Sequence, residues 1–166
     1  AIISISSSDK KLVSQTNLPK EFIAIVLGGV WEYRTYNKWE GVIQNILKGN
    51  RNLNIILLGS RNAKESAKKI SLIYSDKKVF NYVDMYSFNQ TSQIISCADI
   101  VLCCDGGLMH AANALNSTIV PLFARLSPEM QLTNCVNAFP IYDREDVNNI
   151  SCLLYTSDAA DDSLRV

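Results

Sequence analysis

The sequence predicts an α/β fold built on a doubly wound, parallel sheet. Short apolar runs alternate with longer segments in which apolar residues recur at helical spacing. The apolar runs are continuous rather than alternating, which is typical of strands covered on both faces. The links between them are short, so we expect right-handed strand–helix–strand crossovers within one sheet.

Five strands are expected along the chain, and three of them lead into glycines. They are FIAIVLGG (22–29), LNIILLGS (53–60), KVFNYV (78–83), DIVLCC (99–104) and STIVPLF (117–123). Their length and their polar or glycine-containing borders favour strands over buried helices.

Four helices are expected between these strands, at 38–49, 62–74, 87–98 and 107–115. In the first, helical spacing gives one apolar face made of Trp39, Val42, Ile43, Ile46 and Leu47. In the second, the residues expected to face inward are Ala63, Ala67, Ile70, Leu72 and Ile73. Ser87 is expected to cap the third helix.

The chain divides into three parts. Residues 1–21 hold one apolar run, a serine-rich patch and Pro19, and are expected to be a linker or a segment returning to the sheet. Residues 22–151 are expected to form the domain. Residues 152–166 resemble the translation of a transposon-end sequencing adapter and are expected to be non-native. The first residue is not Met, so the chain is interpreted as the interior of a longer protein.

Composition argues against several classes of partner. Sixteen basic and sixteen acidic residues cancel, so the net charge does not favour a nucleic-acid partner. No apolar run reaches the roughly 20 residues that a membrane-spanning helix needs. The five cysteines form no C-x-x-C pair and have no histidine at zinc spacing. No metal is therefore expected, and a reducing cytoplasm is the expected compartment.

Glycines follow the first, second and fourth expected strands. The carboxyl ends of parallel strands meet at one edge of a sheet, where ligands bind, so Gly28–Gly29, Gly59 and Gly106–Gly107 are expected to lie together. Glycine lets a ligand approach the backbone, and a helix N-terminus offers free N–H groups and a positive dipole end. Each glycine alone is explained by a tight turn, but the three together favour a site for an anion such as phosphate.

The stretch CCDGGLMHAANAL (103–115) and the loop after the first strand carry the candidate side chains. Asp105 either caps the next helix, fixes the loop, or binds a hydroxyl or ammonium group, because a carboxylate repels phosphate. His110, the only histidine, is either structural or stabilises a leaving phosphate when protonated. Arg34 and Lys38 are either solvated cations or clamp a diphosphate.

Several phosphate-binding and catalytic motifs are missing from the sequence. It has no G-x-G-x-x-G of dinucleotide oxidoreductases, no P-loop G-x-x-x-x-G-K-[ST] and no G-x-S-x-G elbow. It also has no D-x-D, so a metal-held diphosphate is not expected.

The segment ADIVLCCDGGLMHAANALNSTIVPLF (98–123) resembles the C-terminal half of the family 9 glycosyltransferases, the ADP-heptose:lipopolysaccharide heptosyltransferases. Their pattern reads roughly ADLVVGNDTGPMHLAAALGTPVVALFG. The residues that fall on it are Asp105, Gly107, Met109, His110, Ala111 and Ala112. The order of segments upstream and LFARLSPEMQLT (122–133) are also similar, so the resemblance covers about 22–133.

The resemblance implies a two-domain GT-B enzyme of bacterial lipopolysaccharide biosynthesis, cytoplasmic or peripheral at the inner membrane. This chain would be its C-terminal, Rossmann-like, donor-binding half. A heptose-type sugar would pass with inversion from a nucleotide sugar, ADP-heptose or a relative, to a lipid-linked saccharide, without metal or cofactor. The catalytic base would lie in the N-terminal half, so the fragment alone is expected to be inactive. The implied diphosphate site contains Arg34, Lys38, Asp105, Gly106, Gly107, Met109 and His110.

The sequence departs from the family pattern at positions that bear on the donor. Cys104, Gly106 and Leu108 replace an Asn, a hydroxyl residue and a Pro. The loop after the second strand has Arg61 and Asn62 where an acidic residue often contacts ribose, and VDMYSF (83–88) replaces GKTSL. Two other functions stay open, a non-catalytic flavodoxin-like module and half of a nucleotide-sugar epimerase.

Overall fold

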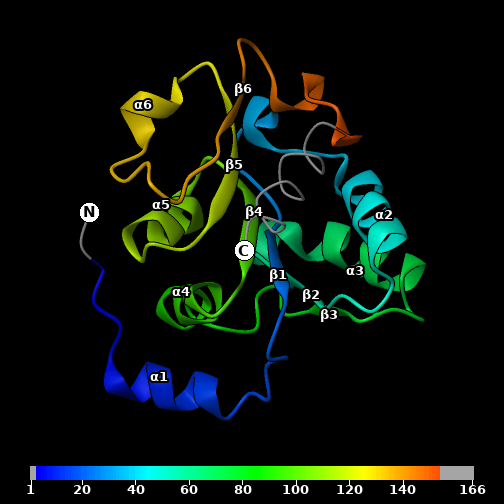
Figure 1. Cartoon of the computed structure of the whole chain (residues 1–166), viewed down its shortest axis with the longest axis vertical. Coiled ribbons are helices and arrows are strands. Elements are labelled where there is room, and N and C mark those ends of the chain that lie inside the picture. Colours follow the sequence, from blue (N-terminus) through cyan, green and yellow to red (C-terminus); the bar gives the residue numbers. More distant parts are fainter. Residues whose placement is uncertain (1–2, 154–166) are drawn as a thin grey trace.

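Six parallel strands form one sheet within residues 3–153, the part of the chain that the computed structural model describes. In chain order they are β1 (Ile23–Val26), β2 (Ile55–Leu58), β3 (Val79–Asn81), β4 (Ile100–Cys104), β5 (Ile119–Ala124) and β6 (Ile141–Asp143). Their order across the sheet is β3-β2-β1-β4-β5-β6 (Figure 1). The winding direction reverses between β1 and β4, and ligands of doubly wound sheets bind at this switch point.

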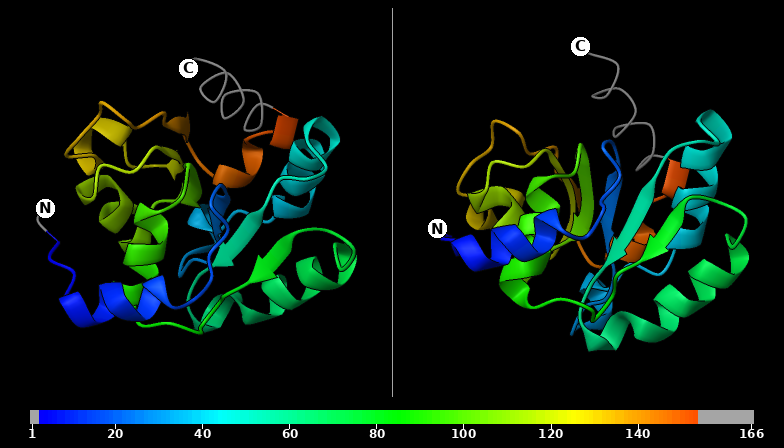
Figure 2. Two further views of the ribbon diagram at one scale, coloured as in Figure 1. Left: turned by 60° about the horizontal axis from the view of Figure 1, so that its bottom comes forward. Right: turned by 90° about the horizontal axis from the view of Figure 1, so that it is seen from below.

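Helices cover both faces of the sheet (Figure 2). One face carries α2 (Trp39–Gly49) and α3 (Lys64–Ile73). The other carries α1 (Ser7–Ser14), α4 (Phe88–Ser96) and α5 (Gly107–Ala114). The loops contain the short helix α6 (Pro128–Gln131) and the 3-10 turns η1 (Glu32–Arg34), η2 (Arg61–Ala63) and η3 (Val147–Asn149).

The pleat of the strands divides the core into two layers. Ile25 pairs in register with Leu57 and Leu102, and all three point to the layer under α2 and α3. The residues one position earlier on each strand point to the layer under α4 and α5. Each fully buried Leu or Ile contributes about 1.5–3 kcal/mol to folding. Continuous apolar strands are what this two-sided burial requires, which confirms the predicted fold class.

The expected elements all form, with ends shifted by up to three residues, and β6 is an addition. β6 is only three residues long and lies at the sheet edge beside β5. Its middle residue, Tyr142, is exposed, and so are Phe80 and Asn81 of the other edge strand, β3. Coverage on both faces therefore holds for the four central strands and not for the edges.

Residues 1–21, expected to be a linker or a segment returning to the sheet, contain α1, which begins after the N-cap Ser6 and buries Val13 against the α4 side of the core. One expectation about individual residues is wrong. Leu72 and Ile73 of α3 do not face inward and are 70% and 49% exposed. The buried residues of α3 are Ala67 and Ile70, and the partly buried Tyr74, directly after the helix, packs against the core.

The C-terminal end of the described residues packs against helix α2. Cys152, the first residue of the expected non-native tail, packs beside Gly41 of α2, and 154–166 lie outside the described residues. No helix within residues 3–153 has the length and apolarity to cross a bilayer.

Candidate functional site

A cleft of about 220 Å³ lies at the carboxyl ends of β1, β2 and β4. Its walls come from residues 26–30, Arg34, Gly59, Ser60, Asn62 and residues 104–109. The structure thus brings all three glycine-containing strand ends to one place, the switch point of the sheet.

The glycines of the cleft serve two different purposes. Gly59 has a φ of +148°, and a Cβ there would lie only 2.7 Å from the carbonyl oxygen of Leu27. Gly59 therefore allows the ends of β1 and β2 to pack closely. Gly106 has an extended backbone, and a Cβ there would meet nothing within 4 Å. The space beside Gly106 is open to a ligand.

The N-terminus of α5 opens onto this space without a side-chain cap. Gly106 is the N-cap residue, and within residues 3–153 no side-chain hydrogen bond caps the helix. The prediction that Asp105 caps the helix is therefore not confirmed. Helix geometry leaves the N–H groups of Gly107, Leu108 and Met109 without intrahelical acceptors. Met109 is only 1% exposed, so any contribution to ligand binding comes from its N–H group rather than its side chain.

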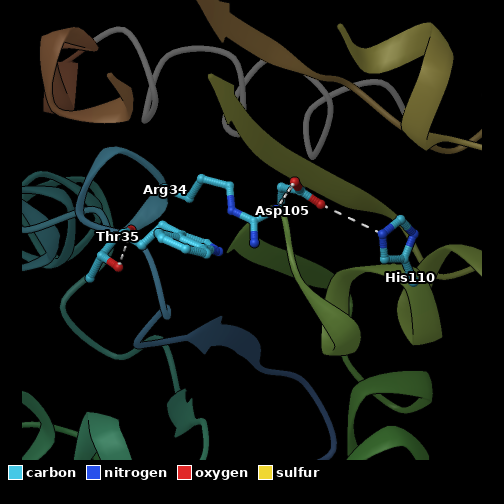
Figure 3. Close-up of polar contacts among 5 residues, drawn as sticks. Arg34, Thr35, Asp105 and His110 are labelled. Atoms are coloured by element: carbon cyan, nitrogen blue, oxygen red, sulfur yellow. Dashed lines mark hydrogen bonds and ion pairs between the residues drawn. The ribbon is translucent and has the colours of Figure 1, made fainter. Parts of the chain in front are cut away.

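Asp105 lies between two candidate cations (Figure 3). Its Oδ2 is 2.7 Å from Nη1 of Arg34, and its Oδ1 is 3.5 Å from Nε2 of His110. The Asp105 side chain is 3% exposed, whereas Arg34 and His110 are 24% and 43% exposed. A buried carboxylate needs such partners, and here they come from η1 on one side and α5 on the other.

Arg34 has N–H groups that can donate hydrogen bonds besides the one in this ion pair. Its Nε is buried and finds no hydrogen-bond acceptor within residues 3–153. An unmade bond to a buried N–H costs about 1–3 kcal/mol, more for a charged group. A guanidinium presents its N–H groups as a fork, so Arg34 can hold Asp105 with one arm and a phosphate oxygen with another.

Lys38, the second expected cation, lies elsewhere. Its Nζ donates to the carbonyl oxygens of Asn148 and Ile150, at the C-terminal side of the domain. It is not among the residues lining the cleft. Of the seven expected site residues, the structure therefore brings Arg34, Asp105, Gly106, Gly107 and Met109 to the cleft wall, places His110 against Asp105, and leaves Lys38 apart.

Sequence reasoning gave no role to two polar residues near this edge, Asn62 and Arg125. Asn62 Nδ2 donates to the carbonyl oxygen of Gly29 at 2.8 Å and ties the β2 loop to the β1 loop. Arg125, directly after β5, has a φ of +67° and stacks its guanidinium 3.9 Å from the centroid of the Tyr33 ring. Arg125 could have been found, because a cation that follows a strand end lies at the same edge as the glycines.

Cys104 also lines the cleft, at the end of β4. Burial raises the pKa of its thiol to about 12, and the nearby Asp105 carboxylate adds to the rise. The thiol is therefore protonated at neutral pH and is not a nucleophile there. Within residues 3–153, no three His, Cys, Asp or Glu side chains lie close enough together to hold a metal ion.

The chain is similar to a family of known proteins over most of its length. The model of glycosyltransferase family 9 (heptosyltransferase) matches residues 3–147. No curated protein sequence matches the chain.

Solved structures agree with that family. Escherichia coli ADP-heptose lipopolysaccharide heptosyltransferase II has a TM-score of 0.76 and 17% identity, covering 96% of this chain and 52% of its own. A family 9 glycosyltransferase from Veillonella parvula scores 0.78 with 12% identity, covering 96% and 53%. The E. coli heptosyltransferase WaaC with ADP-2-deoxy-2-fluoro heptose scores 0.74 with 16% identity, covering 92% and 47%. The chain thus spans about half the length of these proteins.

Proposed function

Because the chain belongs to glycosyltransferase family 9, the heptosyltransferase family, we propose that it binds the sugar donor of an inverting GT-B glycosyltransferase. The donor is a nucleoside diphosphate carrying a heptose-type sugar, and ADP-heptose is the first candidate because a similar structure holds ADP-2-deoxy-2-fluoro heptose. The proposed acceptor is a lipid-linked saccharide of the lipopolysaccharide type. One observation carries the proposal, namely that the uncapped N-terminus of α5 and the Arg34 guanidinium line the same cleft.

The proposed role of the cleft is to stabilise the leaving group. When the bond between the sugar and the diphosphate breaks, negative charge grows on the diphosphate oxygens. The N–H groups at Gly107 to Met109 and the helix dipole favour an anion there, and Arg34 adds a full positive charge. Groups fixed in advance against developing charge lower the barrier, and one such donor contributes roughly 10²–10³-fold in rate.

Asp105 has a different proposed role, since a carboxylate does not bind phosphate. It holds Arg34 at the cleft through the 2.7 Å ion pair, and it can accept a hydrogen bond from a sugar hydroxyl. His110 lies on its other side, with its Nε2 3.5 Å from Asp105 Oδ1, and its proposed role is to stabilise negative charge on the leaving group.

The acceptor site and the catalytic base are proposed to lie in another domain of the enzyme. We propose that the acceptor and the carboxylate base meet the donor from an N-terminal domain, so that this chain binds donor but does not turn over. The mechanism involves no metal or cofactor. The proposed location is cytoplasmic, peripheral to the inner membrane. The five cysteines are all free thiols, as a reducing compartment favours.

Calorimetric titration of the 166-residue chain with ADP, UDP and adenosine tests the proposal. We expect ADP to bind and adenosine to bind much more weakly, because the diphosphate makes the charged contacts. Absence of binding at millimolar ADP would favour the non-catalytic module. A preference for UDP would point to another donor or to an epimerase, since a Methanocaldococcus jannaschii UDP-GlcNAc 2-epimerase has a similar fold, with a TM-score of 0.67.

A further inference from the structure

The segment of residues 146–150, which we call the strap, lies against the loop that carries Arg34. Asn148 makes two contacts with this loop from one side chain. Its Nδ2 donates to the carbonyl oxygen of Thr35 at 3.0 Å, and its Oδ1 accepts from the backbone N–H of Asn37 at 2.9 Å. The amide of Asn148 thus fixes the main chain on both sides of Tyr36.

Two more contacts fasten the same loop to the strap. The Tyr36 hydroxyl donates to the carbonyl oxygen of Ile150 at 3.2 Å. The Lys38 ammonium donates to the carbonyl oxygens of Asn148 and Ile150. Each residue from 35 to 38 therefore has at least one hydrogen bond to the strap.

The strap is itself a firm support. Val147 and Ile150 are 0% and 5% exposed and belong to the core under α2 and α3. Asn148 is held in place by Asp146, whose Oδ1 accepts from its backbone N–H at 2.8 Å and from Nδ2 at 2.9 Å. The loop is therefore tied to the hydrophobic core through the strap.

The loop needs this support because it contains little regular secondary structure of its own. Arg34 ends η1, a 3-10 turn of three residues with no buried member, and such short turns are weak on their own. The next residue, Thr35, is the one whose carbonyl Asn148 holds. A guanidinium binds a phosphate well only if the backbone that carries it is already in place. If the loop becomes ordered only on binding, the entropy that it loses lowers the affinity.

We propose that Asn148 is a positioning residue for the donor site, acting through the 35–37 main chain to hold Arg34 at the diphosphate. This inference rests on the proposed function. It also assigns Lys38 to the strap rather than to the phosphates. Asn148 is 114 residues from Arg34 in sequence and is not among the residues that line the cleft.

The test compares Asn148→Ala with Asn149→Ala in the full chain. Asn149 lies in the same turn, but its Nδ2 donates to Asp143 and not to the loop. We expect Asn148→Ala to weaken ADP binding roughly fivefold, as the loss of two modest hydrogen bonds predicts, and to leave adenosine binding unchanged. Asn149→Ala should leave ADP binding unchanged. An equal loss for ADP and adenosine, or no loss, overturns the proposal.

A double-mutant cycle with Arg34→Ala separates positioning from general stability. If Asn148 acts through Arg34, Asn148→Ala has no further effect on ADP binding once Arg34 is gone, whereas its effect on the melting temperature persists. An additive loss of ADP affinity overturns the proposal. Should Asn148→Ala fail to fold, Asn148→Ser replaces it, because it stays polar but its single hydroxyl cannot make both the bond to Thr35 and the bond to Asn37.

Hydrogen–deuterium exchange of the ligand-free chain distinguishes this inference from the proposed function. We expect Asn148→Ala to speed exchange in residues 32–38 while Asn149→Ala does not. Unchanged exchange in this loop would refute the positioning role even if ADP binds. Failure of the unmodified chain to bind any nucleoside diphosphate would instead overturn the proposed function, and with it the role of the strap at a donor site.

Discussion

Arg34 and Asp105 show how one residue pair serves both folding and the proposed site. The carboxylate is 3% exposed, so removing its partner leaves a buried, poorly compensated charge. The same guanidinium has a buried Nε that finds no acceptor in residues 3–153. Arg34 is therefore the side chain whose loss should be felt most sharply by a phosphate-containing ligand.

We expect Arg34→Ala to weaken ADP binding by roughly 10- to 100-fold, the range of one or two charge-assisted hydrogen bonds. Adenosine, which lacks phosphates, should bind within about twofold of the unmodified chain. Arg34→Lys should fall between, because it keeps the charge and loses the fork. Calorimetry measures all three, with Arg51→Ala as the control, since Arg51 is exposed in the loop before β2, at the amino ends of the strands and away from the cleft. An equal loss for adenosine would refute the diphosphate role.

At the scale of elements, α4 supports the site through its first turn. The Ser87 hydroxyl accepts from the N–H of Gln90 at 3.3 Å, and Gln90 Oε1 accepts from the N–H of Ser87 at 3.1 Å, which is a capping box. Phe88, the first residue of α4, has its ring beside Gly107, where a Cβ would lie 3.6 Å away. The start of α4 thus packs against the start of α5.

Ser87→Ala should lower the free energy of unfolding by about 1 kcal/mol, because it removes an N-cap bond and half of the capping box. Chemical denaturation measures the change. Ser96→Ala is the matched control, since the Ser96 hydroxyl only bonds back to Gln93 at the exposed end of the same helix. Equal effects of the two substitutions would show that the cap contributes nothing special.

At the scale of the whole molecule, buried thiol and phenol groups make the folded chain less stable at alkaline pH. Burial raises the pKa of the Cys104 thiol to about 12 from a usual value of 9.0, and it raises the pKa values of Cys103 and Tyr36 as well. Above about pH 9, these groups ionise in the unfolded chain but stay protonated in the folded one. Their contribution to the free energy of unfolding is complete below about pH 9 and is lost as the pH rises toward the folded pKa values.

The melting temperature should therefore fall progressively between about pH 9 and pH 11, with each such group adding roughly 1.4 kcal/mol per pH unit to the slope. Cys104→Ala should make the fall shallower, whatever its effect at pH 7. Differential scanning calorimetry with a reductant present measures the slope. Cys97→Ala is the control, because Cys97 is exposed. An identical slope for Cys104→Ala would contradict the assignment.

Much of the site could be predicted because it depends on local pattern and on one rule of topology. The glycines after β1, β2 and β4 had to meet once the sheet was known to be parallel. Lys38 and Asn148 could not be predicted in this way. Lys38 is four residues from Arg34, yet its ammonium turns to carbonyls 110 and 112 residues away, and nothing in the local sequence records that contact.

The same limit explains the errors at the level of elements. Helix α1 has a single buried residue, Val13, so its apolar signal is too weak to separate it from a linker. Leu72 and Ile73 are expected to face inward because they are apolar, but near the sheet edge they stay exposed. Tyr74 packs against the core instead. Edge strands such as β6 are short and half exposed, which removes the continuous apolar run that marks a central strand.

The sequence by itself determined the sheet, its direction, the glycine-containing edge and the Asp105–His110 helix start, because backbone propensity and apolar period are written in neighbouring residues. Only the tertiary structure decided which cation faces the cleft, what holds its loop and how Asp105 is satisfied. Those outcomes depend on contacts between residues some 70 to 110 positions apart, where packing geometry, and not local preference, selects the partner.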